Sequence, residues 1–280
     1  MVVALNGTVT MYCNLLTDIR IAKETGYQGI EIVGSKLYRF LDEGFDLSVI
    51  KDSLKDLPVV ALGFIQDLER TEVKEHEALI RETEKICVLA EELECPTVQI
   101  LTGPLIKGGA YKGHPQASRK ELLSLSARNM KEIAAIARTH HLSLYLEALN
   151  WAPLSGLDDS LELINMAAED NIGLVIDFWH MWCVGVTAES IAKLDKRYIM
   201  GVHFCDSSDP LGVRSPDETQ PSRRVWTGGG LVPLKDWVDA VKSTGYDGWW
   251  SPELFSPKHW ELNPWQTALN LRELLEYLLY

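Results

Sequence analysis

The sequence is poor in basic residues and contains no long apolar run. Its 280 residues include 27 Lys and Arg against 40 Asp and Glu, which gives a formal net charge of −13. This balance argues against a general nucleic-acid-binding protein, because the phosphate backbone requires a basic surface. No apolar run reaches the roughly 18 residues of a membrane-spanning helix. The opening segment MVVALNGTVTMYC lacks the basic stretch and apolar core of a signal peptide. We therefore expect a cytoplasmic protein that binds neither nucleic acid nor membranes.

Paired cysteines and phosphate-binding glycine loops are missing as well. The five cysteines are odd in number and include no C-x-x-C pair, so neither a disulfide framework nor a thiolate-rich zinc site is expected. No G-x-G-x-x-G or P-loop motif occurs, which disfavours a doubly wound open sheet. The 46% hydrophobic and 24% charged residues are typical of a globular protein.

Short apolar runs alternate with segments of helical periodicity along the whole chain. Runs such as VVALGF and IGLVI are continuously apolar, as parallel strands buried on both faces are. Eight such units predict an α/β fold, a (β/α)8 TIM barrel in which residues 1–280 form a single domain. The Pro-, Gly- and Ser-rich stretch 207–230 is interpreted as a loop within it. The eight expected strands are Val2–Leu5, Gly29–Val33, Val59–Phe64, Thr97–Leu101, Leu142–Leu149, Ile172–Phe178, Tyr198–Phe204 and Trp249–Phe255.

Four side chains of metal-ligand type stand at or near the ends of four successive strands. They are Glu147, Asp177, His203 and Glu253. Each of these residues, taken alone, could instead be a polar core residue whose hydrogen bonds are satisfied within the protein. Together, at the strand ends where barrel enzymes place their sites, three buried carboxylates require a cation or other partners. This donor set predicts one divalent metal ion, Mn²⁺ first, with Mg²⁺, Co²⁺ and Zn²⁺ as alternatives.

The motifs around these residues resemble a known family. LYLEALN, GLVIDFWH, GVHFCD and SPELF occur in the order seen in the xylose isomerase-like TIM barrel superfamily of sugar isomerases and epimerases, which also contains endonuclease IV. In the ketose 3-epimerases that the chain resembles, the four matching residues hold one metal. The resemblance also places a histidine near the substrate, three residues after the metal Asp, and here that residue is His180.

The resemblance further implies a substrate-binding arginine after the seventh strand. The family loop R-x-x-P-G-E-G matches RVWTGGG, which begins at Arg224, while Thr227 and Gly229 depart from it. Arg224 is therefore the expected substrate-binding arginine, and Arg223 and Arg214 are the alternatives.

The chemistry expected of such a site is proton transfer beside a carbonyl group. A metal that chelates a carbonyl and a neighbouring hydroxyl acidifies the adjacent C–H bond. Glu147 and Glu253 could then act as general base and acid on opposite faces. We therefore expect a metal-dependent isomerase or epimerase of a sugar or related polyhydroxy keto compound, acting by proton abstraction through a metal-bound enediolate.

Departures from the epimerase pattern keep other functions open. The epimerases follow the first metal Glu with P-L-N-R-x-E, whereas this chain continues ALNWAP, so that Arg and Glu are missing. A metal-dependent dehydratase or lyase of the inosose or 3-dehydroshikimate type is the main alternative. An endonuclease IV-like nuclease and a non-catalytic sugar-binding subunit are less favoured, the first because its extra histidine ligands are missing and the net charge is negative.

Further residues are candidates for contact with a small-molecule sugar or cyclitol substrate. Trp151, Trp179 and Trp226 are expected either to stack on a sugar face or to pack in the protein. Glu31 and Gln99 are candidates for contact with substrate hydroxyls. The segment GGAYKGHP reads equally as a lid or as a solvated loop. The closing segment LNLRELLEYLLY is interpreted as closing the barrel, and a homo-oligomer is left open.

Overall fold

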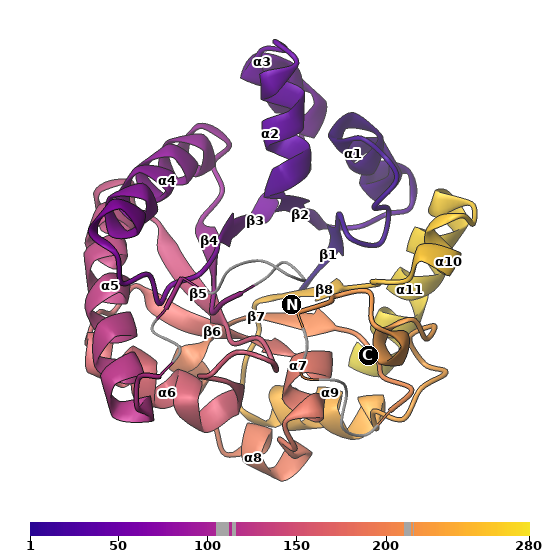
Figure 1. Cartoon of the computed structure of the whole chain (residues 1–280). Helices are drawn as coiled ribbons and strands as arrows, with labels where there is room; N and C mark the ends of the chain where they lie inside the picture. Colours follow the sequence, from indigo (N-terminus) through magenta and orange to yellow (C-terminus); the bar gives the residue numbers. More distant parts are fainter. Residues whose placement is uncertain (105–111, 114–115, 210–213, 215) are drawn as a thin grey trace.

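The strands of the chain close on themselves. The computed structural model describes residues 1–104, 112–113, 116–209, 214 and 216–280. Eight parallel strands form a closed barrel in chain order, with β8 beside β1. Figure 1 shows the strands as an inner ring with the helices outside it. The strands are β1 (Val2–Asn6), β2 (Gly29–Val33), β3 (Val59–Ile65), β4 (Thr97–Leu101), β5 (Ser143–Glu147), β6 (Ile172–Asp177), β7 (Ile199–Phe204) and β8 (Trp249–Pro252).

The outer ring is built from helices whose ends carry local capping groups. Ser118 and Glu121 form the capping box expected at the start of α5. The last helix, α11, packs against α1 and β1 and so closes the ring. The helices are α1 (Leu15–Glu24), α2 (Gly34–Asp42), α3 (Leu47–Leu54), α4 (Val73–Glu92), α5 (Arg119–Thr139), α6 (Gly156–Ala167), α7 (Phe178–Cys183), α8 (Ala188–Ala192), α9 (Leu234–Ser243), α10 (Pro257–Trp260) and α11 (Pro264–Leu279), with short 3-10 turns η1 (Lys196–Tyr198) and η2 (Pro221–Arg223).

The apolar residues form two layers. A large cluster fills the space between strands and outer helices, and a small one that includes Tyr145, Val175 and Trp249 fills the barrel. Gly201 makes room for this inner cluster, because a Cβ there would lie 2.0 Å from the ring of Trp249. The ring centroid of Trp249 lies 5.9 Å from that of His203. The inner cluster therefore packs directly beneath side chains at the strand ends, such as His203.

The barrel expected from the sequence is confirmed, with differences at the strand ends. Strand β5 ends at Glu147 and not at Leu149. Beyond Glu147 the backbone bonds to side chains and no longer to a neighbouring strand, and the N–H of Leu149, for example, donates to Thr102 Oγ1. The short helix α7 was not expected. Asp177 caps it by accepting the N–H of His180.

Three further expectations concern the cysteines, membrane-spanning helices and the segment GGAYKGHP. All five cysteines are free thiols. No helix among the described residues has the length and apolar character needed to cross a membrane. Most of the expected lid segment GGAYKGHP lies outside the described residues.

Candidate metal centre and active site

Strand register brings the four predicted ligand residues together. Asp177 on β6 is level with His203 on β7, and Glu147 ends β5. Glu253 directly follows β8, where its N–H donates to the carbonyl of Phe204. One ligand atom from each of the four residues lies within 4.8 Å of those of the other three, and all four side chains are buried. A cation at this point would have three carboxylates and one imidazole around it.

The orientation of His203 suits a metal ligand. Its Nδ1 atom lies 3.3 Å from Glu147, 3.6 Å from Asp177 and 3.7 Å from Glu253. Its Nε2 atom lies 3.0 Å from Glu31 Oε1, on the opposite side of the ring. A carboxylate behind an imidazole fixes the tautomer and raises the basicity of the nitrogen that faces the metal. Nδ1 is therefore the nitrogen that faces the other three ligand residues.

Burial and the neighbouring charges together shift the pKa values of these four groups. Burial raises the pKa of Glu253 to about 8 and also raises the pKa of Glu147, and neighbouring carboxylates add to both shifts. Burial also disfavours ionised Asp177, but nearby histidines and Arg223 outweigh it and hold its pKa below the ordinary value. Burial alone would lower the pKa of His203, whereas Glu31, Glu253 and Glu147 raise it. A concentration of negative charge in a dry site is the condition that a bound cation relieves.

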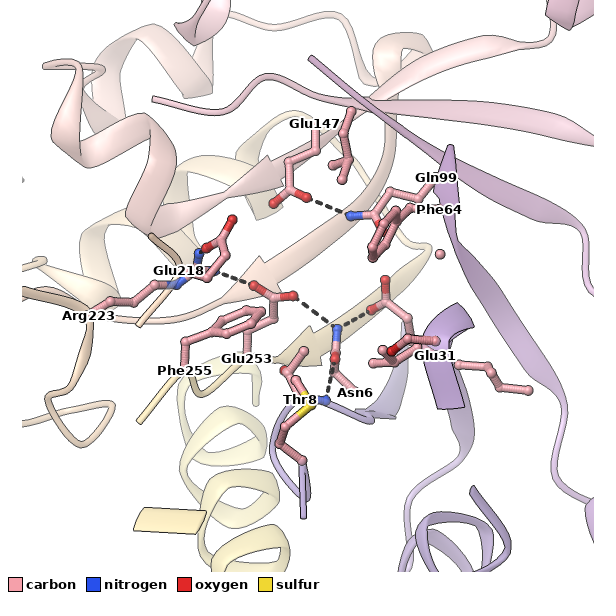
Figure 2. A pocket seen from close by; sticks show the side chains of 16 residues that line it. Asn6, Thr8, Glu31, Phe64, Gln99, Glu147, Glu218, Arg223, Glu253 and Phe255 are labelled. Carbon is pink, nitrogen blue, oxygen red and sulfur yellow. Dashed lines mark hydrogen bonds and ion pairs between the residues drawn. The ribbon is translucent and has the colours of Figure 1, made fainter. Parts of the chain in front are cut away.

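A cavity of about 230 Å³ opens beside the four residues. Glu147 and Glu253 border it, and Figure 2 shows both carboxylates turned toward it. Polar and apolar side chains both line it. The polar residues include Asn6, Thr8, Ser35, Gln99 and Arg223, and the apolar ones Met11, Ile32, Val33, Phe64, Leu101 and Phe255.

Two predicted substrate contacts border the cavity, but with their groups already engaged. Gln99 Nε2 donates to Glu147 Oε2 at 2.6 Å. Glu31 accepts from Tyr145 and Ser251, and from Asn6 Nδ2 at 2.8 Å, in addition to its contact with the imidazole on β7. Both residues hold the metal-site side chains in place.

The structure places Arg223, not Arg224, at the site. The Arg223 side chain is buried and its Nη2 atom contacts Glu253 and Asp177. Arg224 is exposed, and its Nε donates to the carbonyl of Thr219. Arg214 is exposed as well. The alternative Arg223 therefore replaces Arg224, because Arg223 is the last, buried residue of the turn η2 and Arg224 follows it on the surface.

The loop that carries this arginine is held by Asp206, two residues after the end of β7. Its carboxylate accepts the N–H groups of Gly228, Gly230 and Val232 at 2.9 to 3.1 Å. A Cβ at Gly230 would lie 2.3 Å from Asp206 Oδ1, so this close approach requires glycine. The run TGGG therefore shapes the loop.

The structure places the three predicted tryptophans away from the described lining of the cavity. Trp179 is fully buried, and the guanidinium of Arg223 lies 4.6 Å from its ring. Trp151 donates from Nε1 to the carbonyl of Pro104. Trp226 packs against His259, with 5.3 Å between ring centroids.

The aromatic rings on the cavity are instead Phe64 and Phe255. Both were missed from the sequence, although in the expected strand Trp249–Phe255 a period of two would have placed Phe255 on the same face as Glu253. His180 lies beside the metal-ligand candidates, with its Nε2 atom 3.9 Å from Glu147 Oε1, but it is not among the residues that line the cavity. Burial lowers the pKa of His180 to about 3, and the charge of Arg223 also acts in this direction, so the ring is neutral.

A family model described as xylose isomerase-like TIM barrel matches residues 19–279. The chain belongs to this family. It is 26% identical to an inosose isomerase of Halalkalibacterium halodurans over 259 residues, 89% of this chain and 86% of the relative. It is 24% identical to a 3-dehydroshikimate dehydratase of Bacillus anthracis over 230 residues, 78% and 76% of the two chains.

Solved structures show the same fold. A crystal structure of the IOLI protein with a zinc atom aligns with a TM-score of 0.88 at 23% identity, covering 100% of this chain and 98% of the other. The 3-keto-D-glucoside 4-epimerase of E. coli aligns with a TM-score of 0.75 at 18% identity, covering 99% and 98%. The resemblance read from the sequence is thereby confirmed, and the named relatives are enzymes.

Proposed function

We propose that this family member is a divalent-metal-dependent isomerase or epimerase of a neutral, cyclic keto-polyol. One observation carries the proposal: Glu147, Asp177, His203 and Glu253 converge, and two of these carboxylates also border the cavity. These four residues would hold the metal, which when bound supplies charge that acidifies a C–H bond next to a carbonyl group. Mn²⁺ suits the oxygen-rich set, and the zinc in the similar IOLI structure makes Zn²⁺ the second metal to test.

The protein's own groups then divide the work of proton transfer. Glu147 and Glu253 are the two metal-ligand carboxylates that border the cavity, and each exchanges a proton with the substrate carbon from its own side. Gln99 holds the Glu147 carboxylate, and Arg223 holds that of Glu253. The Arg223 guanidinium borders the cavity, 3.3 Å from the neutral ring of His180, and would stabilise the charge that develops on the substrate oxygen.

The charge on the cavity wall supports a neutral substrate. Four carboxylates border the cavity, those of Glu31, Glu147, Glu218 and Glu253. The one guanidinium among the described lining residues, Arg223, is already paired with acidic groups. A substrate carboxylate or phosphate would meet like charge without a free partner. An inosose, a keto-cyclitol like the compound in the name of the relatives, fits these limits.

The second candidate is a dehydratase that uses the same site. The similarity to a 3-dehydroshikimate dehydratase supports it, because proton abstraction followed by loss of a β-hydroxyl needs the same base and metal. The acidic wall of the cavity weighs against a carboxylate-bearing substrate of this kind.

A deuterium-exchange experiment tests the proposal. Protein loaded with Mn²⁺ or Zn²⁺ is incubated with inososes, free ketoses and 3-dehydroshikimate in D₂O and followed by NMR. We expect exchange of the C–H next to the carbonyl and formation of an isomer or epimer of the neutral substrate, both lost in Glu147→Gln. Elimination from 3-dehydroshikimate would instead establish the dehydratase. No exchange with any compound under either metal would refute both.

A further inference from the structure

A fourth cavity carboxylate has no place in the proton transfer described above. Glu218 comes from the long loop between β7 and α9 and borders the cavity, as Figure 2 shows. Its side chain is 16% exposed. It forms an ion pair with Arg223 Nη1, and its Oε1 atom lies 3.5 Å from His180 Nε2. It lies outside the group of four metal-ligand residues.

The position of Glu218 is fixed through Arg223. The Arg223 guanidinium lies over the rings of both Trp179 and Phe255, 4.6 and 4.3 Å from their centroids. Its Nη2 atom contacts the metal-site carboxylates, and its Nη1 atom contacts Glu218 and His180. These ring contacts and ion pairs together restrict the motion of the guanidinium. Glu218 therefore stands at a set distance from the reacting groups.

Glu218 also differs from its neighbours in free acceptor capacity. Glu31 is engaged by four donors, and Glu147 and Glu253 face the metal position. Among the described residues, the partners of Glu218 are Arg223 and His180. An ionised carboxylate has about four acceptor sites, so Glu218 can accept hydrogen bonds from a ligand in the cavity.

The loop after β5 supplies no such group. It continues from Glu147 as ALNWAP, and Trp151 turns away to donate to the carbonyl of Pro104. Among the described lining residues, Glu218 is therefore the acidic residue contributed by a loop and not by a strand or its immediate end.

We infer that Glu218 is a substrate-binding and specificity-determining residue that accepts hydrogen bonds from hydroxyls next to the reacting carbons of a keto-polyol. The inference rests on the proposed function and extends it. Glu218 selects substrates with a hydroxyl at that point and repels those with a carboxylate there. A site built around a polar partner discriminates strongly against an analogue that lacks it, because the buried group is left unpaired.

Two variants and two substrates test this. With metal-loaded enzyme, Glu218→Ala should lower kcat/KM for an inosose by about 10- to 100-fold, the range for hydrogen bonds to charged groups. For deoxy-inososes that each lack one hydroxyl, one analogue should show a difference of less than about threefold between wild type and variant. Bound metal per chain should stay unchanged. Glu189→Gln, which removes an exposed carboxylate on α8, is the matched control and should match wild type.

The outcomes separate this inference from the proposed function. Equal kcat/KM in wild type and Glu218→Ala overturns the inference alone, and so does loss of bound metal in the variant, which would make Glu218 a support of the metal site. Absence of turnover in wild type refutes the proposed function. In that case calorimetric binding of an inositol to both metal-loaded proteins decides, and equal affinity overturns the inference as well.

Discussion

The two halves of the barrel face the same cavity with different chemistry. Strands β5 to β8 and their loops supply the metal-ligand candidates, the guanidinium and the loop carboxylate. Strands β1 to β4 and their loops supply mainly neutral groups, such as Asn6, Phe64 and Gln99. The exception is Glu31, whose oxygens are engaged with both halves. On the proposed function, the second half would carry the reaction chemistry, and the first half would shape the cavity and hold the reacting groups.

The strongest test of this division changes the second half. Glu147→Gln and Glu253→Gln each remove a proton-transfer group while keeping the shape of the side chain. We expect kcat to fall by roughly 10³-fold, within the range for loss of a general acid or base. Steady-state kinetics with the folded, metal-loaded variants would show it. Unchanged kcat in both would mean that neither carboxylate transfers the proton.

The link between the halves is tested at Glu31. Glu31→Gln removes the carboxylate behind His203, so the imidazole loses the partner that fixes its tautomer. We expect metal affinity to fall by about 10- to 100-fold, as for other groups behind a metal-ligating histidine. Competition with a chelator measures it. Equal affinity would show that Glu31 does not act through His203.

The apolar wall of the first half should affect binding alone. Phe64→Ala removes a ring from the cavity and should raise KM roughly tenfold, equivalent to about 1–2 kcal/mol of lost apolar contact. Metal content should not change. Phe45→Ala, at a phenylalanine that is 57% exposed, is the control. A fall in kcat with unchanged KM would place Phe64 in the chemical step.

The last prediction concerns Glu69, in the loop after β3, and affects the pH dependence of stability and not the activity. Burial, and secondarily Asp67, raise the pKa of Glu69 from an ordinary 4.5 to about 8. Between these pH values the folded state holds a proton that the unfolded chain has released, so stability falls as pH rises and levels off above about 8. Glu69→Gln should remove this dependence and be more stable at pH 8 by roughly 2–4 kcal/mol, with no gain near pH 4.5. Denaturation curves measure the free energy of unfolding of both proteins at the two pH values. The same difference between the proteins at pH 4.5 and at pH 8 would contradict this.

The sequence predicted the parts of the molecule that depend on short-range pattern. Apolar runs located all eight strands, and the residues at their ends located the four metal-ligand candidates. Strand ends were less well predicted, because side chains such as Thr102 replace the backbone ladder there. The helix α7 was missed because its six residues are too few to show helical periodicity.

The cavity wall was harder to predict than the metal centre. Arg223 and Arg224 are neighbours in sequence, and only the folded turn shows which one enters the site. Glu218 lies in a loop with no periodic signal, so nothing in the sequence singled it out. The sequence suggested tryptophans as sugar-stacking groups. In the structure Trp179 packs against the Arg223 guanidinium, and the aromatic residues that line the cavity are Phe64 and Phe255.

The central claim is that the four strand-end residues of the second half hold a metal ion. Elemental analysis of purified protein, with and without added Mn²⁺, tests it most directly when wild type is compared with His203→Ala and with His76→Ala as the control. We predict about one metal ion per chain in wild type and the control, and loss of it in His203→Ala. No metal under any condition, or equal metal in all three proteins, would contradict the account.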